Sequence, residues 1–142
     1  MNREIKFRGL RSDSKRWVYG FYSPVNVPIL GTLGYCINEY GYRAIDINFE
    51  SLGQYTGLKD LNGKEIYEGD ILQWTSSWKK HDNTDDKGMV YNNVVEYYVG
   101  SNYCGYRIKN KSFTKNLTGR NGILNASAIV IGNIYENPEL LK

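Results

Sequence analysis

The stretch QYTGLKDLNGKEIYEGDIL, residues 54–72, decides how the rest of the chain divides. It holds the densest set of turn signals in the sequence. Asn62-Gly63 is the dipeptide best suited to a two-residue type I′ hairpin turn, in which both positions need φ > 0. Gly69-Asp70 predicts a second bend, and an apolar, strand-like run follows it at once. We therefore expect one subdomain over residues 1–68 and another over residues 69–142.

The composition favours strands on both sides of this stretch. Aromatic residues make up 14% of the 142 residues, with 13 Tyr and 3 Trp, and such side chains suit the pleated surface of a sheet. Fifteen Gly and only 3 Pro indicate many tight turns. No segment resembles a long amphipathic helix. The predicted fold is mostly β, all-β or β-rich α+β, with an N-terminal β-hairpin subdomain followed by a small SH3-like or OB-like barrel.

Period-two alternation places the strands. In the first part it predicts a hairpin at 4–11 and 16–22, a loop at 23–34 with a short edge strand at 25–27, and a short pair at 35–38 and 42–47. In the second part it predicts strands at 70–77, 89–99, 105–110, 113–117 and 128–135, a polar loop at 81–88 and a terminal helical turn at 138–141. The apolar run 128–131 is typical of a strand buried on both faces.

Few residues carry the chemistry of an active site. His81 is the only histidine and lies in the acidic stretch HDNTDDKG, where zinc would lack further N or S ligands. Asp60–Glu65 starts like a calcium loop, but its glycine comes too early and no terminal Glu follows. Cys36 and Cys104 lack the flanking residues of a known thiol enzyme. We expect buried, reduced structural thiols, no metal or other cofactor, and no enzyme activity.

The charge is small overall but unevenly distributed. The formal net charge is +3, while residues 1–20 alone hold six basic side chains against two acidic ones. Residues 97–135 hold five basic side chains and no acid. No apolar run reaches the ~20 residues of a membrane helix, and the charged N-terminus has no signal-peptide core. These features predict a cytoplasmic protein without membrane association.

The basic zones suggest one specific surface. If residues 105–111 form a strand, three cations share a face and alternate with Tyr106 and Ile108. Cations beside aromatic rings are typical of single-strand nucleic-acid surfaces, although the same residue types also suit protein interfaces. The candidate site residues are Arg8, Arg11, Arg16, Tyr106, Arg107, Lys109 and Lys111.

Several blocks of the sequence resemble the YopX family of phage and prophage proteins. They are REIKFRG at 3–9, WVYG at 17–20, QYTGLKD at 54–60, NGKEIYEGDI at 62–71 and IGNIYENP at 131–138. Residues 76–88 match no motif. The resemblance implies a β-rich fold with an SH3-like barrel in the C-terminal part, and an origin inside a bacterial host cell. It supplies no catalytic residues.

The sequence predicts a non-enzymatic phage accessory protein that acts as a protein-binding module. Its partner would be a phage or host protein, or a second copy in a homo-oligomer. The alternative is a nucleic-acid-binding protein that uses the basic, tyrosine-rich strand face. A metal-assisted enzyme using the acidic residues ranks last.

Overall fold

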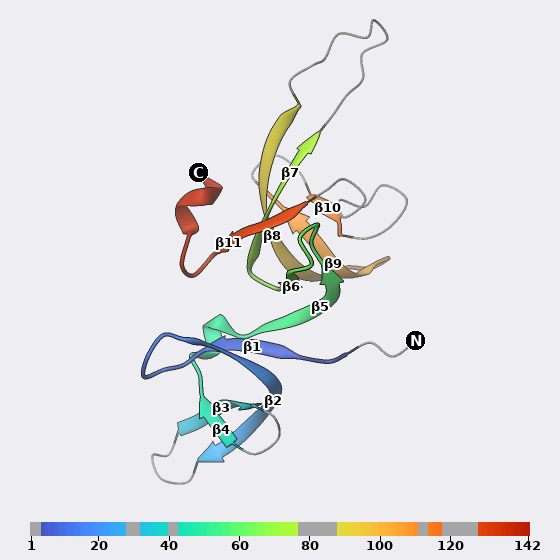
Figure 1. Cartoon of the computed structure of the whole chain (residues 1–142). Helices are drawn as coiled ribbons and strands as arrows, with labels where there is room; N and C mark the ends of the chain where they lie inside the picture. Colours follow the sequence, from blue (N-terminus) through green and yellow to red (C-terminus); the bar gives the residue numbers. More distant parts are fainter. Residues whose placement is uncertain (1–3, 28–31, 40–42, 77–87, 111–113, 118–127) are drawn as a thin grey trace, which may run out of the picture. The chain divides into compact units, whose positions relative to one another are not determined.

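The computed structural model describes residues 4–27, 32–39, 43–76, 88–110, 114–117 and 128–142, with the backbone alone for 23–27, 32–39, 43 and 76 (Figure 1). The described residues form strands and short 3-10 turns, so the mostly-β prediction is confirmed. The chain divides into two compact units, Met1–Gly57 and Leu58–Lys142. The division lies before the turn at 60–64, whereas the sequence places it after Glu68.

The first unit is one antiparallel sheet with the strand order β4-β3-β2-β1-β5. The last two residues of β5 already belong to the second unit. Its elements are β1 (Phe7–Leu10), β2 (Trp17–Val27), β3 (Thr32–Glu39), β4 (Arg43–Asp46), the 3-10 turn η1 (Phe49–Ser51) and β5 (Gly53–Lys59).

Side-chain alternation on β2 explains which face of this sheet is buried. Val18 lies in a cluster with Ile45 and Ile47, while Tyr19 and Phe21 are exposed. Opposite Val18 on β1 stands Gly9, where an added Cβ would lie 2.7 Å from Ile47 Cδ1. A glycine is therefore needed for β1 to approach this core closely.

The second unit is built on another antiparallel sheet, with the order β10-β9-β8-β7-β11. β6 forms a hairpin with the end of β5. The elements are β6 (Glu65–Tyr67), β7 (Asp70–Ser76), β8 (Met89–Val99), β9 (Cys104–Lys109), β10 (Thr114–Asn116), β11 (Ile129–Asn133) and the 3-10 turn η3 (Pro138–Leu141).

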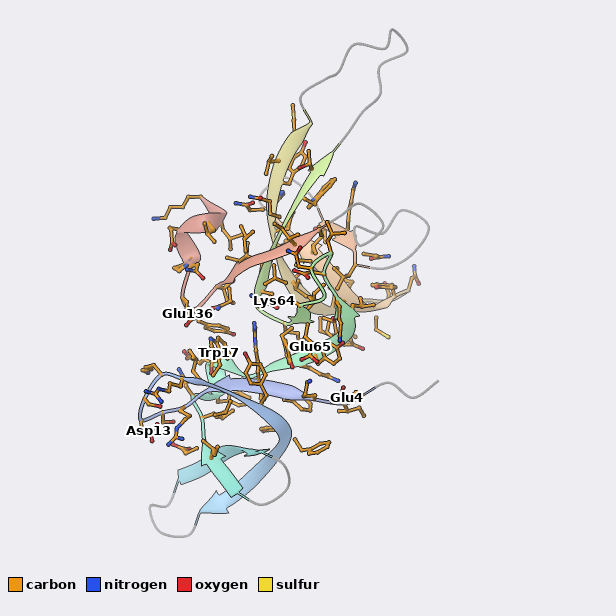
Figure 2. All side chains as sticks on the ribbon, viewed as in Figure 1. Glu4, Asp13, Trp17, Lys64, Glu65 and Glu136 are labelled. Atoms are coloured by element: carbon orange, nitrogen blue, oxygen red, sulfur yellow. The ribbon has the colours of Figure 1, made fainter. Side chains whose placement is uncertain are left out.

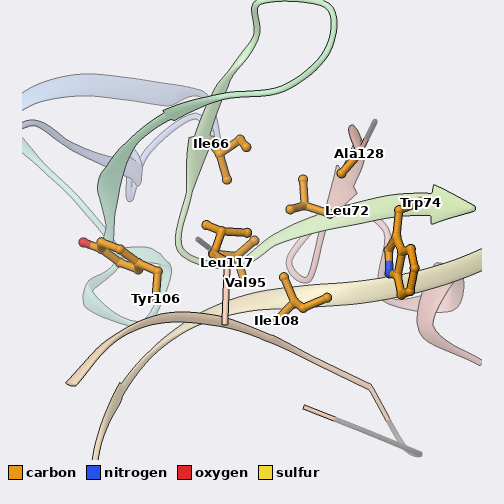
Figure 3. Packing of buried hydrophobic residues seen from close by; sticks show 8 residues of the cluster. All are labelled: Ile66, Leu72, Trp74, Val95, Tyr106, Ile108, Leu117 and Ala128. Atoms are coloured by element: carbon orange, nitrogen blue, oxygen red, sulfur yellow. The ribbon is translucent and has the colours of Figure 1, made fainter. Parts of the chain in front are cut away.

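Alternating residues of β7, β8 and β9 enclose the core of the second unit (Figure 3). Ile66, Leu72 and Ile108 are fully buried within it. Each such side chain contributes about 1.5–3 kcal/mol through removal of apolar surface from water. The other buried members of this cluster are Trp74, Val95, Tyr106, Leu117 and Ala128.

The turn between β5 and β6 differs from the predicted type I′ turn. Gly63 N–H donates to Asp60 O at 3.0 Å, and Asp60 N–H donates to Lys64 O at 2.8 Å. Gly63 has φ +80°, but Asn62 is not among the described residues with positive φ. The loop therefore has three residues, with the glycine in the left-handed position after a type I-like turn. The prediction that both Asn62 and Gly63 have positive φ was wrong.

Three further features of the strands differ from the prediction. The stretch 23–34 was predicted as a loop with a short edge strand at 25–27, but residues 25–27 are the end of β2, which continues to Val27 and pairs with β3 from Thr32. β5 was not predicted, because its glycines and its Gln54 interrupt the alternation that marks a strand. β11 is half-buried rather than covered on both faces, and among the described residues it pairs with β7 alone.

Candidate interaction surface

Among the described residues of the second unit, exposed aromatic side chains gather at the turn end of the β8–β9 hairpin. Four large side chains gather there and are solvent-exposed: Tyr97 at 47%, Tyr98 at 36%, Val99 at 73% and Tyr103 at 38%. We call these four residues the tyrosine end. Consecutive Tyr97 and Tyr98 point to opposite faces of the strand, so an aromatic ring is presented on each side of the hairpin.

Local contacts hold the rings of the tyrosine end in place. Tyr97 packs edge-on against Tyr106 of β9, with ring centroids 5.1 Å apart. The Tyr103 hydroxyl donates to Tyr106 O at 3.3 Å, and Gly100 N–H donates to Tyr103 O at 2.9 Å to close the turn. Rings held in this way lose little conformational entropy when a partner binds.

Arg107 connects the tyrosine end to the rest of β9. Its Nε donates to Glu96 Oε1 at 2.6 Å, and its guanidinium lies 3.7 Å from the centroid of the Tyr98 ring. A planar guanidinium can stack on an aromatic face and bind a carboxylate at the same time. The cation is therefore already engaged by a neighbouring acid and a neighbouring ring.

The two described cations of the predicted basic stripe lie on one face of β9, and Tyr106 and Ile108 lie on the other, as alternation predicts. Arg107 and Lys109 share the face away from the core, whereas Tyr106 and Ile108 are buried in the core. Tyr106 therefore lies on the opposite side of the sheet from the two cations. Lys111 lies outside the described residues.

The predicted cations of the first unit are placed differently from one another. Arg8 is buried, with its guanidinium 4.4 Å from the centroid of the Trp17 ring. Arg16 is exposed in the turn between β1 and β2. Asp13, labelled in Figure 2, lies in the same turn. Arg11 Nε donates to Asp13 Oδ1 at 2.8 Å. The hydrogen bond from Arg11, followed by that from Ser14, holds the pKa of the Asp13 carboxyl well below its usual range.

Two shallow hollows lie elsewhere on the surface. One, of about 240 Å³, lies in the first unit between Ile5 and the exposed Tyr19 and Phe21. The other, of about 270 Å³, lies in the second unit between β8 and η3. Within the described ranges, no three His, Cys, Asp or Glu side chains gather to form a metal site. His81 and its acidic neighbours fall outside those ranges. The prediction of a buried thiol was wrong for Cys104, which is exposed, and the side chain of Cys36 is outside the described part of the structure.

The blocks shared with the YopX family contain hydrogen-bonded acceptors. Both oxygens of the buried Asp60 carboxylate accept from backbone N–H groups, at 2.8–2.9 Å, donated by Asn62, Lys64 and Val130. Asp70 Oδ2 accepts from Tyr67 N–H at 2.8 Å. Asn133 Oδ1 accepts from Tyr135 N–H at 3.0 Å. Asp60 thereby links the β5–β6 turn to β11, Asp70 links the start of β7 to β6, and Asn133 fixes the turn after β11.

The model of the family described as YopX protein matches residues 6–142. The chain belongs to the YopX family. The match covers nearly the whole of both units and confirms the resemblance drawn from the motif blocks. The tyrosine end lies inside the matched range but outside those blocks, and the sequence signal for it was the Tyr97-Tyr98 pair next to a predicted turn.

A solved structure has the same fold over the whole length of this YopX protein. It is described as the crystal structure of protein EF1440 from Enterococcus faecalis, with 26% sequence identity and a TM-score of 0.58. The alignment covers 99% of this chain and 100% of the other. No curated protein matches the chain. Within the described residues, no helix has the length and apolar character needed to cross a membrane.

Proposed function

We propose that this YopX protein is a non-enzymatic protein-binding module that contacts its partner through the tyrosine end. The observation that carries the proposal is the exposure of three tyrosines and Val99 at one well-packed hairpin turn. Tyrosine is enriched among the residues that dominate binding energy, and Arg107 beside Tyr98 adds a second residue type of that kind. A surface of this composition favours a protein partner.

Family membership supports the cellular setting of the proposal. The YopX resemblance implies a phage or prophage accessory protein, and the related structure comes from a bacterium. We therefore place the protein in the cytoplasm of a bacterial host, with a phage or host protein as its partner. The five antiparallel strands around one core also support an SH3-like barrel for the second unit, although β10 and β11 are not paired with each other among the described residues.

Site-specific photo-crosslinking in bacterial cells tests the binding surface. A benzophenone amino acid at Val99 should give a discrete cross-linked product after irradiation. The same probe at Met89, which is 67% exposed at the other end of β8, is the matched control and should give none. Equal products from both positions, or none from either, would contradict the proposal.

Nucleic-acid binding is the second candidate, and it is favoured by the shared outward face of Arg107 and Lys109. Its weakness is that Arg107 and Arg11 are each engaged by a carboxylate. The test is binding to fluorescent single- and double-stranded DNA and RNA at ~50 and ~200 mM salt, because phosphate contacts make affinity fall steeply with salt. Salt-sensitive binding lost in an R107A/K109A variant would favour this candidate over the protein-binding module.

A further inference from the structure

On the outer face of the β8–β9 hairpin, residues of complementary charge or size stand opposite each other in the strand register. In the register of the two strands, Glu96 stands opposite Arg107, and Tyr98 stands opposite Gly105. These residues alternate with the core residues Val95 and Ile108, so they lie on the face away from the core. An acid on β8 therefore faces a base on β9, and a large ring on β8 faces a position without a side chain.

The two glycines of this hairpin let the tyrosine rings lie close to the backbone. A Cβ added at Gly100 would lie 2.5 Å from Tyr98 Oη, and one added at Gly105 would lie 2.6 Å from Tyr103 Oη. Each ring thus covers a glycine. Tyr98 and Tyr103 therefore form an aromatic surface that lies close to the backbone, and the pair Glu96 and Arg107 lies at its edge.

Consider a two-fold axis that runs parallel to the strands, above the outer face and midway between β8 and β9. Rotation about this axis would place the outer face of a second copy against the same face of the first. The operation places β8 of one copy over β9 of the other. Glu96 then meets the partner's Arg107, and Tyr98 meets the partner's Tyr103 above Gly105. Two-fold interfaces require a surface that is complementary to itself. We infer that the tyrosine end binds the tyrosine end of a second copy of this chain, so that the protein forms a two-fold dimer.

The distribution of charge favours a second copy over a differently charged partner. Residues 97–106 contain no charged side chain, in a chain in which 23% of the residues are charged. Two such faces approach without mutual repulsion, although each chain carries a net charge of +3. Among the described residues of this face, the charges nearest the tyrosines are those of Glu96 and Arg107, which exchange partners across the axis, while Lys109 lies farther from the turn. This inference rests on the proposed function, since it names the partner of the same surface.

Sedimentation equilibrium of the full chain at increasing concentration tests the dimer. The expected mass rises from 16.3 kDa to twice that value. Y98S should weaken the association by about tenfold or more, because truncation of a central aromatic costs at least ~1.4 kcal/mol. M89S, which changes an exposed side chain far from the turn, should leave the association unchanged.

Charge exchange gives the sharper test. Glu96→Arg places two cations on the border of one copy, and Arg107→Glu places two acids on the border of another. Each variant alone should be monomeric, and an equimolar mixture should form a mixed dimer. Circular dichroism of each variant checks that it is folded. A wild-type dimer that persists equally in Y98S and in both charge variants would overturn the inference.

The outcomes separate this inference from the proposed function. A chain that stays monomeric at every concentration overturns the dimer. If the probe at Val99 then cross-links a different protein while that at Met89 does not, the protein-binding proposal stands without the dimer. If the chain is monomeric and neither position gives a product, both fail. A dimer that Y98S weakens and M89S does not, together with a product from Val99 and none from Met89, supports both.

Discussion

Two hairpin turns of the second unit, β5–β6 and β8–β9, contain similar glycine and asparagine residues but orient their side chains in opposite ways. The β5–β6 turn directs its carboxylate inward, where Asp60 is 7% exposed and accepts three backbone N–H groups. The β8–β9 turn directs its largest side chains outward. The first hairpin belongs to the YopX motif blocks and the second does not. The comparison shows that the residues that identify the family hold the fold, whereas the residues proposed to bind lie elsewhere.

The largest expected effect comes from removing the inward carboxylate. D60A leaves three partly buried backbone N–H groups without their charged acceptor, and a hydrogen bond to a charged group contributes about 1.5–3 kcal/mol. We expect the free energy of unfolding of the second unit to fall by about 3 kcal/mol. Native-state hydrogen exchange at amides of β7 and β8 measures it. N62A, at an exposed position in the same turn, is the matched control. Equal losses of stability in the two variants would show that the inward carboxylate does not stabilise the turn.

The same contrast explains how much of the fold could be predicted from the sequence. β8 was predicted at its observed bounds, Met89–Val99, because alternation within a strand is a local signal. β5 was not, because its pairing with β1 is set by a strand more than 40 residues away. The three-residue turn was missed because the Asp60 side chain, which bonds Asn62 and Lys64, selects it over a type I′ turn.

The candidate site was predictable to the same degree. Alternation placed Arg107 and Lys109 on one face of β9. It could not reveal that Glu96 would bond Arg107, because that contact depends on the register between two strands. Burial of Arg8 beside Trp17 was hidden for a similar reason, since the pairing of β1 with β2 brings the two residues to one face of the sheet.

β8 itself carries a smaller test of the comparison. Asn93 is fully buried, and neither its Nδ2 nor its Oδ1 has a hydrogen-bond partner in the described part of the chain. N93V removes this unpaired amide, and we expect it to raise the free energy of unfolding by about 1 kcal/mol. Its neighbour Asn92 is the opposite case, because its Oδ1 accepts from Gln73 and its Nδ2 donates to Leu140 O.

N92A should therefore lower the free energy of unfolding by about 1 kcal/mol, opposite in sign to N93V. Thermal melts followed by circular dichroism compare the two variants. A destabilised N93V protein would show that the Asn93 amide is satisfied in solution. In that case the strand leading to the tyrosine end would be as fully bonded as the β5–β6 turn.

The tyrosine end should contribute little to stability. Val99 is largely exposed, so V99S removes few contacts, and surface changes of this kind usually shift stability by about 0.5 kcal/mol or less. We expect an unchanged denaturant midpoint in a urea titration of V99S. If V99S lowers the free energy of unfolding as much as D60A does, the hairpin turn is a part of the core. The distinction between residues that stabilise the fold and residues that bind a partner would then be wrong.

The smallest expected effect concerns a turn carboxylate that stays at the surface. Asp13, between β1 and β2, pairs with Arg11 in solvent, so its pKa is depressed while the pair adds little stability. Because the pKa is lower in the folded state, this small contribution is present above the unfolded-state pKa of ~3.9 and is lost as the pH falls through the folded-state value.

A carboxyl ¹³C NMR titration should find Asp13 still ionised where exposed Asp side chains are protonated. R11M should return its pKa towards the ordinary value, because the Arg11 hydrogen bond is the main cause of the shift. A titration midpoint that R11M leaves unchanged would show that the pair of Arg11 and Asp13 does not persist in solution. A turn carboxylate of this protein would then be held firmly only where its partners are backbone amides in a partly buried turn, as at Asp60.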